Sequence, residues 1–145
     1  MGARPLFYRL TVDRPRVVLA EDHARVAEQL QKVLEAEFEV IETVADGHAL
    51  LRATEESRPD VVVTDIVMPG LDGIAATAAL LARDPRARVV LVTVHSDSEL
   101  AERGFAAGAL ACVLKHTAAI ELVPAVRAAM RGERYVPPSG PADRH

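Results

Sequence analysis

Five short apolar runs recur along the chain from residue 16 onward, and each has about the length of a β-strand. None of these runs shows the alternation of polar and apolar residues that is typical of a strand with one wet face. Strands that are apolar throughout are typical of a parallel sheet with helices on both faces. The runs are Val17–Leu19, Val40–Ile41, Val61–Val63, Val89–Val92 and Cys112–Leu114. This pattern restricts the chain to the α/β class of folds.

Segments of helical composition lie between the apolar runs. In the first of them, Val26, Leu30 and Leu34 fall on one stripe of a helix, and charged residues occupy the other side. Ser96 and Glu99 have the spacing of a capping box and predict the start of the fourth helix. The other helices are expected near residues 47–57, 73–83, 97–107 and 118–131.

Strands and helices alternate five times, which predicts a (βα)₅ unit over residues 16–131. Because crossovers between parallel strands are right-handed, this unit forms a three-layer α/β sandwich. Gly132 can end the last helix, and prolines soon after it cannot continue one. We therefore expect an N-terminal extension at 1–15 and a C-terminal linker or tail at 132–145.

Composition and charge exclude several classes of protein. The 145 residues suffice for one domain, and the net charge of −4 does not favour direct binding to nucleic acid. The single cysteine, Cys112, excludes an internal disulfide framework and a cysteine-based zinc site. No apolar run approaches the roughly 20 residues that cross a bilayer. The chain is expected to reside in the cytoplasm and not in a membrane.

Polar residues follow four of the five predicted strands. Glu21 and Asp22 come after the first, Asp65 ends the third, Thr93 ends the fourth, and Lys115 ends the fifth. In an open parallel sheet, sites lie beyond the carboxyl ends of the strands. We therefore expect these side chains to converge on one edge.

Each of these residues has an ordinary structural role when it is taken alone, such as a helix cap for Asp22 or a strand position for Thr93. Three clustered carboxylates, however, repel one another unless a cation is present. The set suits phosphoryl transfer onto Asp65, since an aspartate can form an acyl phosphate. Glu21 and Asp22 would hold a hard divalent cation.

Several stretches resemble the receiver domain of two-component response regulators. They are residues 17–23, 61–73, 89–93 and 108–115, and the resemblance covers residues 16–131. The fifth strand and residues 131–135 are most similar to the subfamily with a LuxR-type helix-turn-helix output. The resemblance implies a flavodoxin-like fold with the parallel strand order 2-1-3-4-5.

The same resemblance implies roles for single residues. Asp65 would be the phosphoacceptor, with a sensor histidine kinase or a phosphotransfer protein as donor. Asp22 and Asp65 would ligate Mg²⁺ (or Mn²⁺) directly, the backbone carbonyl of Val67 would add a ligand, and Glu21 would act through water. Thr93 and Lys115 would bind the phosphoryl group, and Thr93 would move toward it.

Two positions depart from the family pattern. Family members commonly have an aromatic residue three positions before the lysine and a proline after it, where this chain has Cys112 and His116. Cys112 thus occupies the position of the switch aromatic. We expect signalling from Asp65 to the output surface to work without the rotation of an aromatic ring.

The resemblance also implies an output. It is control of transcription through a DNA-binding domain that is absent from this chain, with no enzyme activity beyond phosphorylation and dephosphorylation of its own aspartate. A homodimer could form through the first and fifth helices, or through the fourth helix, fifth strand and fifth helix.

Other functions are less compatible with the sequence. A stand-alone phosphorelay or protein-binding switch remains the main alternative. A phosphohydrolase of the haloacid-dehalogenase type needs a second aspartate two residues after the first, where this chain has Val67. No glycine-rich loop follows the first strand to bind a nucleotide. His23, His95 and His116 lie near the same edge, and a histidine metal site is a further alternative.

Overall fold

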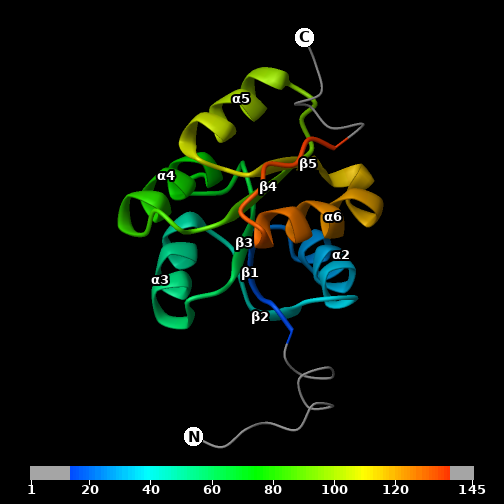
Figure 1. The fold of residues 1–145 in the computed structure, drawn as a ribbon, viewed down its shortest axis with the longest axis horizontal. Helices are drawn as coiled ribbons and strands as arrows, with labels where there is room; N and C mark the ends of the chain where they lie inside the picture. Colours follow the sequence, from blue (N-terminus) through cyan, green and yellow to red (C-terminus); the bar gives the residue numbers. More distant parts are fainter. Residues whose placement is uncertain (1–13, 138–145) are drawn as a thin grey trace, which may run out of the picture.

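A parallel sheet with the strand order β2-β1-β3-β4-β5 is the centre of the fold (Figure 1). The computed structural model describes residues 14–137, so the predicted extension (1–15) and tail (132–145) lie largely outside the described residues. The strands are β1 (Arg16–Ala20), β2 (Glu39–Val44), β3 (Val61–Asp65), β4 (Val89–Thr93) and β5 (Ala111–Leu114). The predicted α/β class and strand order are confirmed.

Helices cover both faces of this sheet. They are α2 (Ala24–Glu35), α3 (Gly47–Ser57), α4 (Gly73–Arg83), α5 (Ser98–Ala107) and α6 (Ala118–Met130), with a short 3₁₀ helix, η1 (Lys115–Thr117), before α6. In Figure 1, α2 and α6 lie on one side of the sheet and α3, α4 and α5 on the other. Within residues 14–137, no helix has both the length and the apolar character needed to cross a membrane.

Two hydrophobic clusters fill the space between the layers. In β1, Val17 and Leu19 pack with Leu34 of α2 on one face, while Val18 packs with Leu50 of α3 on the other. Every residue of β3, β4 and β5 is buried. The apolar runs lack alternation because both faces of the sheet are covered.

The start of α5 differs from the prediction. The helix begins at Ser98, and its N-cap is Asp97, whose side chain accepts a hydrogen bond of 2.8 Å from the amide of Glu99. The predicted capping box of Ser96 and Glu99 is therefore wrong by one position. Aspartate caps a helix as well as serine does, and Asp97 lies next to the first turn, so it takes the role.

Gly132 ends the last helix, as predicted. Its φ of +72° is in the left-handed region, which glycine adopts without a steric cost. The amide of Gly132 donates to the carbonyl of Ala129, and the amide of Glu133 donates to that of Ala128. These bonds close the helix in the manner of a Schellman motif and reverse the chain toward β5.

Gly73 fixes the loop after β3. Its amide donates to the carbonyl of Ile66 at 2.7 Å. A Cβ atom at position 73 would lie only 2.0 Å from the carbonyl oxygen of Asp65. The first residue of α4 therefore packs against the end of β3 at a distance that only glycine permits.

We predict that Gly73→Ala lowers the free energy of unfolding by about 3 kcal/mol, because the new methyl group collides with backbone that cannot move freely. Gly132→Ala is the matched control, since nothing lies within 4 Å of its Cβ position and only its positive φ opposes the change. We expect that control to lose about 1 kcal/mol. Urea unfolding of both variants measures the difference, and equal losses would contradict this account of Gly73.

Candidate functional site

The predicted polar residues do meet at the carboxyl edge of the sheet. Glu21 follows β1, Asp65 ends β3, and Lys115 follows β5 as the first residue of η1. The Lys115 Nζ atom lies 2.8 Å from Asp65 Oδ2 and 2.7 Å from Glu21 Oε1. One ammonium group therefore joins carboxylates from two strand ends.

Three carboxylates lie together at this edge. One oxygen each from Glu21, Asp22 and Asp65 can be chosen so that all lie within 4.8 Å of one another. Glu21 and Asp65 are buried, and Asp22 is exposed. No histidine of the described part of the chain belongs to this group. The arrangement has a deep pair of acids and a third acid open to solvent.

The two oxygens of Glu21 have different partners. Its Oε2 accepts a hydrogen bond of 3.1 Å from the amide of His23. Its Oε1 is buried, and the ammonium of Lys115, at 2.7 Å, is the one partner that the described residues offer it. A buried oxygen of this kind has capacity for a further partner, such as a bound water.

Asp22 is not the cap of the helix that follows it. His23 is the N-cap of α2, and its Nδ1 accepts a bond of 3.4 Å from the amide of Val26. The ordinary role of Asp22 as a helix cap, considered from the sequence, is therefore wrong. Its carboxylate remains available to the acidic group.

Asp65 is held from two sides. Its Oδ2 contacts Lys115, and its Oδ1 accepts a bond of 3.3 Å from the amide of Val67. Asp65 is buried at the end of β3, which lies between β1 and β4, and its register partner on β4 is Val92. These contacts fix the carboxylate at the edge while the neighbouring Val67 is 56% exposed.

Thr93 lies at the same edge, at the end of β4, and is fully buried. Its Oγ1 accepts a bond of 3.0 Å from the amide of His95. A hydroxyl that accepts a bond can still donate its own proton. Within residues 14–137, Thr93 makes no hydrogen bond to the acidic group.

Burial and charge act in opposite directions on Lys115. Burial alone would lower the pKa of its ammonium group, but the hydrogen bonds that the ammonium donates to Asp65 and Glu21, together with the charges of these acids, outweigh burial and raise that pKa. The lysine is therefore held in its charged form beside the two acids.

Cys112 lies behind the site and not in it. It is buried in β5 with Leu91 as its register partner on β4, and it packs in the cluster on the α3, α4 and α5 side. Burial raises the pKa of its thiol to about 12. The thiol is thus a packed, protonated group.

Sequence reasoning did not identify two backbone contacts that position the site. The amide of His23 orients Glu21, and the amide of His95 orients Thr93. Both donors are backbone groups, which every residue except proline possesses, so no residue type in the sequence marks them.

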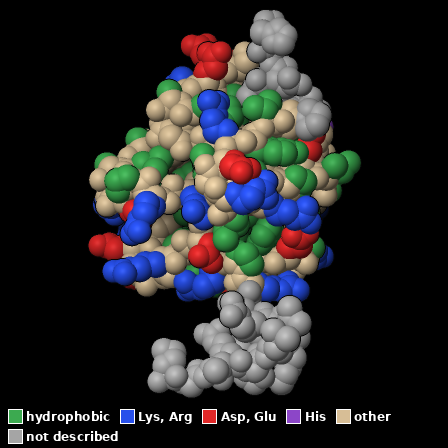
Figure 2. Space-filling view, viewed as in Figure 1, with side chains coloured by type: hydrophobic (Ala, Val, Ile, Leu, Met, Phe, Trp, Pro, Cys, Tyr) green, Lys and Arg blue, Asp and Glu red, His purple; other side chains and the backbone are tan. Residues whose placement is uncertain are grey.

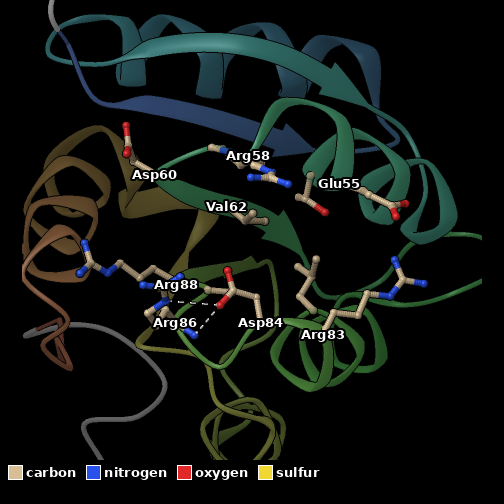
Figure 3. A pocket seen from close by; sticks show the side chains of 12 residues that line it. Glu55, Arg58, Asp60, Val62, Arg83, Asp84, Arg86 and Arg88 are labelled. Atoms are coloured by element: carbon tan, nitrogen blue, oxygen red, sulfur yellow. Dashed lines mark hydrogen bonds and ion pairs between the residues drawn. The ribbon is translucent and has the colours of Figure 1, made fainter.

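A second concave feature lies at the other end of the strands, near the starts of β3 and β4. It is a groove of about 900 Å³. Figure 3 shows Arg83 and Arg88 extending to opposite sides of this groove, with Asp84 between them. Arg88 also donates to the carbonyl of Met130. The basic residues that line the groove are Arg58, Arg83, Arg86 and Arg88. Because Arg83 and Arg88 extend to opposite sides and Arg86 is paired with Asp84, the acidic edge remains the candidate site.

Surface charge gives no second candidate on the face in Figure 2. Basic and acidic side chains are interspersed there. Because charges of both signs alternate there, that face offers no support for a continuous basic surface that would bind nucleic acid.

The chain was compared with known families and curated proteins. Residues 17–127 match the family described as "Response regulator receiver domain". The transcriptional regulatory protein LiaR of Bacillus subtilis (strain 168) is 38% identical over 120 residues, which cover 81% of this chain and 57% of that protein. The chain spans a little over half the length of the curated relatives it matches.

Solved structures give a similar result. A LuxR-family two-component response regulator from Aurantimonas sp. SI85-9A1 aligns with a TM-score of 0.81 and 34% identity, covering 86% of this chain and 89% of that one. The signal receiver domain of the putative response regulator NarL from Mycobacterium tuberculosis aligns with a TM-score of 0.79 and 30% identity, covering 83% of this chain and 98% of that one.

The contact of Lys115 with two acids leads to a prediction. We expect Lys115→Met to lower the free energy of unfolding at pH 7 by about 3 kcal/mol, because it leaves Glu21 and Asp65 without their cation. Lys32→Met is the matched control, since Lys32 is the only other lysine and is exposed. We expect that control to stay within about 0.5 kcal/mol of the unmodified protein.

The pH dependence of this loss follows from the raised pKa of Lys115. A group whose pKa is raised by folding stabilises the fold fully below its ordinary value of 10.5 and loses that contribution at higher pH. The gap between the unmodified protein and Lys115→Met should therefore be constant near neutral pH and narrow above 10.5. Urea unfolding across this range measures it, and a gap that widens with alkali would contradict the assignment.

Proposed function

Because this chain belongs to the family of response regulator receiver domains, we propose that Asp65 accepts a phosphoryl group from a sensor histidine kinase or a phosphotransfer protein. The resemblance predicted from the sequence, including the LuxR-type relatives, is confirmed. The family consists of receiver domains of two-component systems and not of catalytic enzymes. The observation that carries the proposal is the contact of Lys115 with Asp65 inside a group of three carboxylates.

The proposed reaction is a transfer between two residues. A carboxylate oxygen of Asp65 attacks the phosphorus atom of a phosphohistidine, and an O–P bond forms. The P–N bond breaks, and its electron pair stays on the imidazole of the donor. Asp65 is suited to this role because Lys115 and the Val67 amide hold its carboxylate in one orientation.

A divalent cation fits the oxygen ligands at this edge. Three carboxylates with oxygens within 4.8 Å of one another form the hard, anionic ligand set that Mg²⁺ or Mn²⁺ prefers. We assign Asp22 and Asp65 as direct ligands, the carbonyl of Val67 as another, and Glu21 as a partner through water. Such a cation would neutralise the charge on the transferred group.

Two further residues would contact the phosphoryl oxygens. Lys115 would supply an ammonium, and Thr93 would donate the hydroxyl proton that its contact with His95 leaves free. Cys112, at the position of the switch aromatic, is a small side chain that is already buried. A movement of Thr93 would then be transmitted by repacking of β4 and β5 and not by a ring that swings inward.

The output we propose is control of transcription. LiaR is named a transcriptional regulatory protein, and this chain matches a little over half of its length. In a chain of similar length, residues 16–131 would be the receiver, residues 132–145 would lead to a DNA-binding domain, and the whole would act in the cytoplasm. A homodimer that forms through α2 and α6, or through α5, β5 and α6, would link the receiver to the DNA-binding domain.

The phosphoacceptor assignment can be tested by intact mass after incubation with acetyl phosphate and Mg²⁺. We expect one added phosphoryl group on the unmodified chain and none on Asp65→Asn, because the amide is not a competent nucleophile. Asp72→Asn is the matched control, since asparagine caps α4 as well as aspartate does. Labelling that persists in Asp65→Asn would refute the assignment.

The cation assignment has its own test. We expect Asp22→Asn to weaken Mg²⁺ binding about tenfold, because one anionic ligand is lost while the fold is retained. Asp60→Asn is the control, since Asp60 lies at the opposite edge and its amide oxygen can still accept from the Arg16 amide. Calorimetric titration with Mg²⁺ measures both. Equal affinities in the two variants would exclude Asp22 as a ligand.

A further inference from the structure

The chain continues beyond α6 along the free edge of the sheet. After the reversal at Gly132, residues 133–137, here called the strap, run beside β5 (Figure 1). The amide of Tyr135 donates to the carbonyl of Leu110 at 2.8 Å, and Tyr135 forms a parallel bridge with Ala111. The strap therefore takes the place of a sixth strand at the start of β5.

Side chains of the strap reach both faces of the sheet. Tyr135 is half-buried and packs against the cluster beneath α2 and α6. The guanidinium of Arg134 lies 4.1 Å from the ring centroid of Phe105, which belongs to α5 on the other face. Pro137 is buried. The strap thus connects the core to α5 across the edge.

The two edges of the sheet differ in how they are protected from pairing with another chain. At one edge, β2 carries Glu39 and Glu42, which are exposed, and such charges oppose pairing. At the other, β5 is Ala-Cys-Val-Leu, is uncharged and is buried along its whole length. An edge of that composition, if uncovered, is a template for a further strand.

The strap has the two features that β5 lacks. Arg134 is an exposed charge, and Pro137 has no amide proton with which to continue a ladder. The strap is also held by few contacts, namely one backbone hydrogen bond, one bridge and one ring contact among the described residues. Segments with so few contacts open more easily than a core does.

We propose that the strap is a removable cover, and that its release opens the β5 edge to a second copy of this chain. A β5 edge is complementary to itself, because two copies related by a twofold axis align their β5 strands antiparallel. The partner surface would be the α5, β5 and α6 face. This inference does not depend on the proposed phosphoryl chemistry.

The test is a variant that releases the strap in the full chain. Tyr135→Pro removes both the amide proton that bonds Leu110 and the ring that packs on the core. Val136→Ala is the control, since this neighbour is 47% exposed. By sedimentation velocity we expect Tyr135→Pro to dimerise about tenfold more tightly than the unmodified chain and Val136→Ala to be unchanged.

Hydrogen exchange locates the interface. We expect the amides of Ala111–Leu114 in Tyr135→Pro to gain protection as protein concentration rises. A free peptide of residues 132–137 should reverse the association, and the same peptide carrying Tyr135→Pro should not. A folded Tyr135→Pro that stays monomeric, or that associates without protection of β5, would overturn the proposal.

A milder variant decides the case in which Tyr135→Pro does not fold. Arg134→Ala keeps the amide of Tyr135 and removes only the contact with Phe105. We expect it to self-associate more than the unmodified chain, with the same protection of β5. If Arg134→Ala has the same oligomeric state as the unmodified chain, the strap is not the cover that we infer.

Discussion

The ammonium of Lys115, placed between Glu21 and Asp65, is the interaction on which the site depends. Two buried carboxylates at adjacent strand ends would repel each other strongly in a partly desolvated edge. The lysine joins them at 2.7 and 2.8 Å and so makes the acidic group compatible with a stable fold. Asp22, the third acid of the group, is exposed to solvent. The same contact therefore stabilises the acidic group on which the proposed phosphoryl transfer depends.

Much of the fold follows from the sequence because only one arrangement of the apolar runs buries both of their faces with short connections. Strands that are apolar on both faces need a layer of helices on each side, and short connections with right-handed crossovers then fix the sheet. The helix near 73–83 was predicted with its observed bounds because Gly73 and the turn before it mark its start. The start of α5 was not, because Ser96, Asp97 and Ser98 are all good caps and only tertiary packing chooses among them.

The candidate site could be predicted in its members but not in its contacts. Residues at the ends of parallel strands share an edge, so Asp65 and Lys115 could be placed together from their positions alone. Which oxygen meets the ammonium, and which amides hold Glu21 and Thr93, depends on loop backbone that carries no residue signature. The Tyr135 bridge with Ala111 was missed for a similar reason, since residues 132–145 have the composition of a linker.

The separation of 50 residues between Asp65 and Lys115 has a consequence for synthesis of the chain. The ribosome produces β1, β3 and their three carboxylates well before it produces β5. Domains generally fold as units, and a nascent chain that ends before β5 lacks the counter-ion of these acids. Docking of the last strand is therefore also the moment of charge neutralisation. The carboxyl edge should be the final part of the nascent domain to become stable, which ties completion of the site to completion of the chain.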